Sequence, residues 1–150
     1  MARTIHWLLM LALLLPASAH AADGLIKQAS PHDPAATAER FVEVAEEAGL
    51  NIFARVDHAA GAAEVDMDLP PTEVIIFGNP RGGTPFMQCA QSVGIDLPLK
   101  ALVWEDADGQ TWLGYNDPHY IAKRHDVADC PAADGIAEAL AGLAASTVQP

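Results

Sequence analysis

The sequence predicts an α+β domain: a mostly antiparallel sheet of about five strands, with helices packed mainly on one face. Residues 72–86 have the pattern of a strand, a Gly-rich loop and the start of a short helix. Residues 96–117 have the pattern of two strands around a tight turn. Apolar residues at helical spacing lie on both sides of these segments, and together the patterns give the fold class.

Residues 24–29 are expected to form the first strand. Asp33 and Pro34 then supply a helix N-cap and the proline that favours the first helical position. We therefore predict a helix over residues 34–48, ended by Gly49.

Alternating apolar residues over 51–57 predict a strand with one buried face. The Ala-rich residues 58–65 predict a helical turn, and Pro70 and Pro71 predict an extended entry to the next strand. Residues 74–77 are continuously apolar, which indicates a central strand covered on both faces.

The turn residues 106–109 lie between two strand patterns, so residues 99–105 and 110–115 are expected to form an antiparallel hairpin. A short helix over 118–124 and a last helix over 131–145 complete the prediction.

The N-terminus has the order of a secretory signal: Arg3 and His6, the apolar run 7–15, and small residues up to an expected cleavage after Ala21. About nine apolar residues are too few to span a bilayer, which takes roughly 20. We expect residues 1–21 to be removed, leaving 22–150 as one periplasmic or secreted domain with no stable membrane anchor.

The formal net charge is −12, and the few Lys and Arg residues are scattered along the chain. Such a surface repels phosphate backbones, so nucleic-acid binding is excluded as a function.

Cys89 and Cys130 are the two cysteines of the chain. Because an exported protein enters an oxidising compartment, we expect them to form a disulfide. Two buried thiols, or a thiolate bound to a metal or haem, are the alternatives.

The Gly-rich segment 78–85 leaves a strand and enters a helix, so it is a candidate anion site. The ligand-facing candidates in it are Asn79, Arg81 and Thr84. It lacks the Lys-Ser/Thr ending of a phosphate-binding P-loop, and a purely structural turn is the alternative.

His58 is a further ligand-binding candidate because it directly follows a strand. Beside Asp57 it could act as an acid–base catalyst if the chain turns there. A histidine that only stabilises the strand-to-helix corner is the alternative.

His58, Met87 and Cys89 are also the candidates for binding haem or copper. The sequence has no Cys-x-x-Cys-His motif for covalent haem, so this cofactor is only an alternative.

The other histidines and the serines predict no site. His119 and His125 are six residues apart, so one helix cannot direct both at one metal, and we expect them at the surface. Ser30, Ser92 and Ser146 lie in no nucleophile elbow, and an ordinary hydrolase is not predicted.

Four segments together resemble the bacterial and archaeal domain of unknown function 302 family. They are DHAAGA (57–62), LPPTEVIIFGNPRGGTPFMQ (69–88), IDLPLKALVWED (95–106) and GYNDP (114–118). The resemblance implies a compact α+β domain that commonly forms a homodimer, and it supplies no catalytic residues. The cysteine pair resembles a feature of exported members.

The leading hypothesis is an exported, non-enzymatic, dimeric domain that binds a small ligand or a periplasmic protein partner. A haem- or copper-binding protein with its cofactor near a dimer interface is the first alternative, and an acid–base enzyme using His58 is the second.

Overall fold

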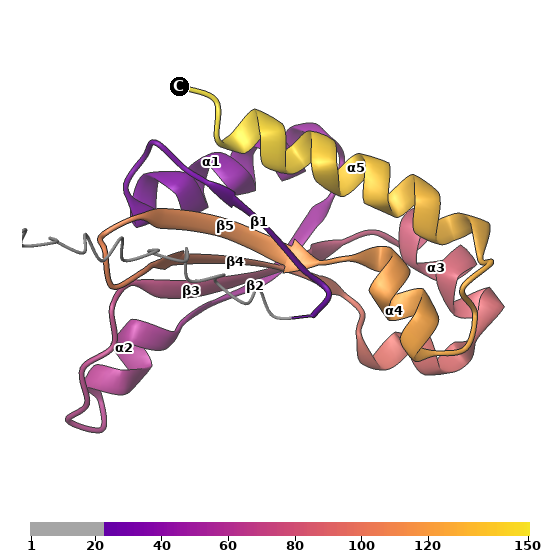
Figure 1. Cartoon of the computed structure of the whole chain (residues 1–150), viewed down its shortest axis with the longest axis horizontal. Helices are drawn as coiled ribbons and strands as arrows, with labels where there is room; N and C mark the ends of the chain where they lie inside the picture. Colours follow the sequence, from indigo (N-terminus) through magenta and orange to yellow (C-terminus); the bar gives the residue numbers. More distant parts are fainter. Residues whose placement is uncertain (1–22) are drawn as a thin grey trace, which may run out of the picture.

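The computed structural model describes residues 23–150; the predicted signal peptide and its cleavage point lie outside the described residues. The five strands form one antiparallel sheet in the order β1-β5-β4-β3-β2 (Figure 1). They are β1 (Leu25–Ala29), β2 (Asn51–Asp57), β3 (Thr72–Gly78), β4 (Leu99–Glu105) and β5 (Thr111–Asn116).

Helices α1 and α5 lie on the same face of the sheet, α2 projects from the opposite side, and α3 and α4 lie together at one end (Figure 1). The predicted α+β class is therefore confirmed. The helices are α1 (Pro34–Glu47), α2 (His58–Ala63), α3 (Pro80–Cys89), α4 (Pro118–Arg124) and α5 (Pro131–Thr147), with a 3₁₀ turn η1 (Gln91–Ile95) between α3 and β4.

The main core lies between the sheet and helices α1 and α5. Phe41 of α1 and Phe77 of β3 are both buried and meet edge to face, with ring centroids 4.9 Å apart. Leu113 of β5 and Leu140 of α5 belong to the same core. This arrangement buries the apolar stripes that the helical spacing predicts.

Strand β3 differs from its prediction. It lies between β4 and β2, and Ile75 and Phe77 are buried under the helices, whereas Val74 and Ile76 on the opposite face are only partly buried. The expectation of cover on both faces was wrong, because α1 and α5 cover one face of the sheet only (Figure 1). On the other face Val74 and Ile76 are partly buried by the side chains of neighbouring strands. Val74, for example, lies opposite Leu102 in the register with β4.

The Gly-rich segment also differs from its prediction, because most of it is helix and not loop. The Asn79 side chain caps α3 by accepting from the Gly82 N–H at 2.9 Å, and Pro80 takes the first helical position. This N-cap and proline pair outweighs the low helix propensity of Gly82 and Gly83. Gly78, with φ of 152°, makes the sharp exit from β3 that precedes the helix.

The disulfide between Cys89 and Cys130 is confirmed, with the two Cα atoms 6.1 Å apart. It joins the end of α3 to the N-cap residue of α5. Between these helices lies a second, smaller core that contains the buried Phe86, Val93 and Ile121.

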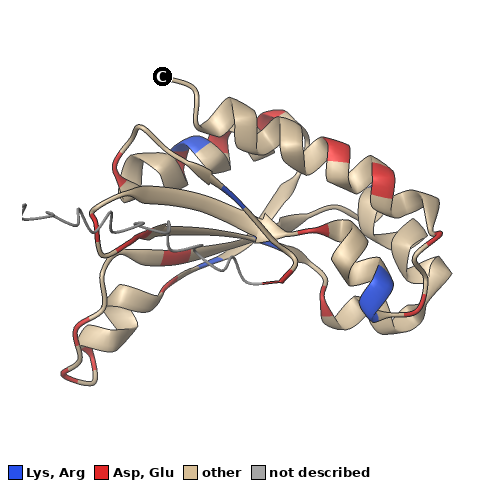
Figure 2. Cartoon of the chain, in the orientation of Figure 1, with Lys and Arg blue, Asp and Glu red and all other residues tan. Residues whose placement is uncertain are grey.

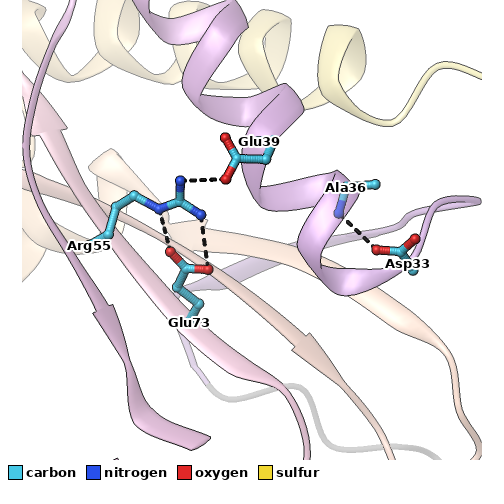
Figure 3. A network of polar contacts seen from close by, with 5 residues as sticks. All are labelled: Asp33, Ala36, Glu39, Arg55 and Glu73. Carbon is cyan, nitrogen blue, oxygen red and sulfur yellow. Dashed lines mark hydrogen bonds and ion pairs between the residues drawn. The ribbon is translucent and has the colours of Figure 1, made fainter. Parts of the chain in front are cut away.

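Arg55 links three elements at the exposed end of the main core (Figure 3). From β2 it donates to both carboxylate oxygens of Glu73 on β3 and to Glu39 of α1, the latter at 2.6 Å. The bonds to Glu73, and then to Glu39, raise the pKa of the guanidinium above its ordinary value. The Arg55 side chain is 34% exposed, so solvent screens these pairs and they add little to stability.

Candidate functional site

A cavity of about 780 Å³ opens between α3, α5 and the adjoining end of the sheet. We call it the α3–α5 cavity. Its lining is mainly apolar and includes Leu50, Phe77, Met87, Leu97, Ile136 and Leu140. A volume in this range is typical of pockets that take small organic ligands, for which about 300–1,000 Å³ is usual.

Polar side chains enter the cavity lining from the first two turns of α3. They are Asn79, Arg81 and Thr84, and Arg81 is the one charged residue among the described residues that line the cavity. Arg81 and Thr84 are exposed, which places them at the edge of the cavity and not in its depth. Asn79 is partly occupied with capping α3, so Arg81 is the group best suited to meet an anion.

The fourth ligand-binding candidate, His58, lies elsewhere. Asn51, at one end of β2, pairs with Gly78 beside the cavity, whereas His58 follows the other end of the same strand. Seven strand residues span about 20 Å, so His58 is far from Arg81. Asp57 caps α2 by accepting from the Ala60 N–H at 2.9 Å. Asp57 is thus the N-cap residue of α2, and His58 is the first residue of that helix.

The three candidates for binding haem or copper are not brought together. Met87 lines the cavity, the Cys89 sulfur is bonded to Cys130, and His58 lies at the far end of β2. Within residues 23–150, no three His, Cys, Asp or Glu side chains are grouped so that they could hold a metal ion. The geometry therefore favours the cavity over a metal centre as the candidate site.

A histidine bridge that no sequence pattern indicated joins α4 and α5. His119 contacts Asp134 with Nε2 at 2.9 Å and Asp117 with Nδ1 at 3.1 Å. The bond to Asp134, followed by that to Asp117, raises the pKa of His119 above its ordinary value. Asp117 is also the N-cap of α4, so the bridge joins the starts of the two helices.

A second histidine cluster was also missed, and the expectation that His125 lies at the surface was wrong. Its side chain is only 8% exposed and lies between Ser92 and Asp96, while Arg124 binds the other oxygen of Asp96. The partners are about 30 residues apart in the sequence. Only the packing of α4 against η1 makes them neighbours, so no local motif could have identified them.

Charge is distributed unevenly over the molecule. Acidic residues are spread over helices and loops, including the loop after α2, whereas basic residues are few, and only Lys123 and Arg124 at the end of α4 are adjacent in the described chain (Figure 2). Arg81 is therefore a local positive charge in a chain with a net charge of −12.

Across residues 23–150 no helix has both the length and the apolar character needed to cross a bilayer.

His119→Gln is expected to lower the free energy of unfolding more at pH 5.5–6 than at pH 8.5. Because the pKa of His119 is raised in the folded state, the protonated ring stabilises the fold fully below its unfolded pKa of about 6.5. This contribution is lost as the pH rises through the raised folded pKa. Urea unfolding of both proteins at the two pH values measures it, and an equal difference at both would contradict the bridge.

Comparison with known proteins agrees with this fold. The family model described as "Domain of unknown function DUF302" matches residues 26–146. Two curated relatives are fluoride-specific ion channel FluC 1 of Brucella suis biovar 1 and FluC 2 of Brucella melitensis biotype 1. Each is 51% identical over 104 residues, which is 69% of this chain but only 41% and 38% of those proteins. The chain thus spans about two fifths of their length.

A solved structure is also similar: the crystal structure of an uncharacterized conserved DUF302 protein from Bacillus stearothermophilus. The TM-score is 0.76 at 20% identity, over 84% of this chain and 99% of the other. This likeness shows a shared fold. With the family match over nearly all of the described residues, it leads to one conclusion: the chain belongs to the DUF302 family.

Proposed function

We propose that this protein is an exported domain that binds a small apolar ligand carrying an anionic group in the α3–α5 cavity. The observation that carries the proposal is Arg81, a single positive charge at the edge of a cavity whose other lining is almost entirely apolar. An apolar body and one fixed charge are the features by which a site selects an amphiphilic anion.

The start of α3 adds to this preference. Backbone N–H groups at a helix N-terminus give a partial positive charge, and the first turn of α3 lies in the cavity lining through Arg81, Gly82 and Gly83. The Gly82 and Gly83 N–H groups are bonded to Asn79 and Pro80 has none, so the Arg81 N–H is the one that can meet a ligand directly. An anion beside Arg81 would therefore meet favourable potential from both the side chain and the helix, while its apolar part contacts Met87 and Ile136.

Relatives that carry the name fluoride-specific ion channel are much longer than the segment they share with this chain. That name describes the whole proteins, and we assign no fluoride-related role to the shared segment.

Titration calorimetry with dodecanoate as the probe tests the proposal. We expect Arg81→Gln to weaken dodecanoate binding by about tenfold, because the charged hydrogen bond it removes contributes roughly 1.5–3 kcal/mol, part of which the amide recovers. Dodecanol, which has the same chain and no charge, should bind wild type and variant alike.

A matched pair of variants on α5 locates the ligand. Gly135 lines the cavity and Gly142 does not, yet both have open space where a side chain would begin. Gly135→Leu should block dodecanoate binding, and Gly142→Leu should leave it unchanged, since both substitutions raise helix propensity equally. Equal binding by the two variants would exclude the cavity.

The export expectation rests on the N-terminal pattern and is supported by the disulfide, which is typical of oxidising compartments. We expect the protein recovered from the periplasm or medium of its native host to begin at Ala22. Recovery of cytosolic protein that still carries residues 1–21 would contradict export.

We further propose that the chain forms a homodimer through the face of the sheet opposite α1 and α5. This face carries Val56, Ile76, Leu102, Trp104 and Trp112, which are exposed or only partly buried. Contiguous apolar surface of this kind is typical of protein interfaces.

Charge complementarity favours a second copy as the partner. Lys27 lies on the β1 edge, over the Trp112 ring at 4.0 Å, whereas α2 and the loop after it follow β2, the strand at the other edge. That loop is acidic. It also carries two apolar side chains that face solvent, Val65 and Met67, which are 64% and 65% exposed. A two-fold axis parallel to the strands would place the loop of each copy on the side of the β1 edge of the other, where Lys27 lies.

Light scattering after gel filtration tests the dimer. We expect twice the mass of the mature chain for wild type, and the monomer mass for Val56→Lys, which introduces a charge on the open face. Ala141→Lys, at an exposed position of α5 on the other side, is the control and should remain dimeric. A monomer mass for wild type at all concentrations would refute the proposal.

A further inference from the structure

Three side chains at the junction of η1 and α4 have the connectivity of a nucleophile, a base and an orienting acid. The Ser92 Oγ lies 2.9 Å from Nδ1 of His125, and Nε2 of the same ring lies 2.6 Å from Asp96 Oδ2. Arg124 donates to the other carboxylate oxygen at 2.7 Å. None of these residues lines the α3–α5 cavity, so the cluster is separate from the proposed ligand site.

The contact with Asp96 fixes one proton of the His125 ring. An aspartate carboxylate only accepts hydrogen bonds, so the short contact to Asp96 requires a proton on Nε2 of His125. When the ring is neutral, its lone pair is therefore on Nδ1, and this nitrogen faces the Ser92 hydroxyl. In this form of the ring the Ser92 O–H donates to His125, which is the arrangement that activates a serine.

The positions of the three residues suit this chemistry. Ser92 lies on the exposed 3₁₀ turn η1, where an incoming substrate can reach its oxygen. His125 and Asp96 are largely shielded from water, with side chains 8% and 12% exposed. Because both partners of the ring are fixed, the imidazole is held in one orientation.

We propose that Ser92 is a nucleophile for acyl transfer from small carboxylic esters, with His125 as its general base and Asp96 as a positioning residue. The Ser92 oxygen attacks the ester carbonyl carbon and its proton passes to Nδ1 of His125. The bond to the alcohol breaks, and the alcohol leaves with that proton. Water, deprotonated by His125, then cleaves the acyl-serine to release the acid and restore Ser92.

This activity goes beyond ligand binding in the cavity and does not depend on it. The same contacts also hold η1 against the end of α4. If the cluster had this structural role alone, Ser92 would be no more reactive than any exposed serine. Covalent labelling distinguishes a reactive Ser92 from a purely structural cluster.

The experiment treats the mature, disulfide-bonded protein with a fluorophosphonate probe and locates the adduct by peptide mass spectrometry. We expect the adduct on Ser92. Labelling should be lost in Ser92→Ala, which has no nucleophile, and reduced by about 100-fold or more in His125→Gln, since a general base contributes on that scale. Ser146→Ala, which removes an exposed serine on α5, is the control and should label as wild type does.

Nitrogen chemical shifts of the His125 ring give a readout that does not need activity. They should show the Nε2–H form in wild type and in Ser92→Ala, which confirms an intact site in the unreactive variant. Asp96→Asn should shift the proton between the two nitrogens and slow the labelling. Labelling at the same rate in Ser92→Ala, an adduct spread over several serines, or an Nδ1–H ring in wild type would each overturn the proposal.

Discussion

The disulfide between Cys89 and Cys130 is the constraint on which the α3–α5 cavity, the proposed ligand site, depends. It closes a sequence separation of 41 residues, and a loop of that length contributes about 4 kcal/mol in the chain-entropy account. A typical domain is stable by only about 5–15 kcal/mol, so one bridge supplies a large share. It also acts locally, because it fixes the end of α3 to the start of α5.

This local effect matters because the molecule has two cores and the cavity lies where they meet. Phe77 and Leu140 reach the cavity from the main core under α1 and α5. Met87 and Ile136 reach it from the periphery of the small core around Phe86. The sheet stabilises the first side through many strands, whereas the second depends on a few helices and the disulfide. Arg81 and Thr84 belong to the less supported side, on α3.

Much of the fold could be predicted from the sequence, because its signals are local. The Asp33-Pro34 start of α1, the 106–109 turn and the alternation of β2 all act within a few residues, and these elements lie where expected. The buried face expected for β2 was wrong, because β2 is the edge strand of the sheet and only Ile52 in it is partly buried. The helical state of Gly82 and Gly83 was missed because glycine composition was given more weight than the Asn79 cap. The incomplete burial of Val74 and Ile76 was missed because an apolar strand does not reveal how many of its faces a helix covers.

The candidate site could be predicted only in part, for the same reason. Asn79, Arg81 and Thr84 are close in sequence, so one segment identified them together, but the cavity beside them is formed by α5, more than 40 residues later. The pairing of His125 with Ser92 and Asp96 depends on the packing of α4 against η1. No residue spacing encodes such a contact, and it is visible only in three dimensions.

Hydrogen exchange of the mature protein, oxidised and then reduced, tests the central claim most directly. If the disulfide holds α3 in place beside the cavity, reduction should speed amide exchange across residues 80–89 while β3 and β4 stay protected. If exchange in α3 is unchanged by reduction, packing alone positions this side of the cavity. That result would contradict the claim that the α3–α5 cavity depends on the disulfide.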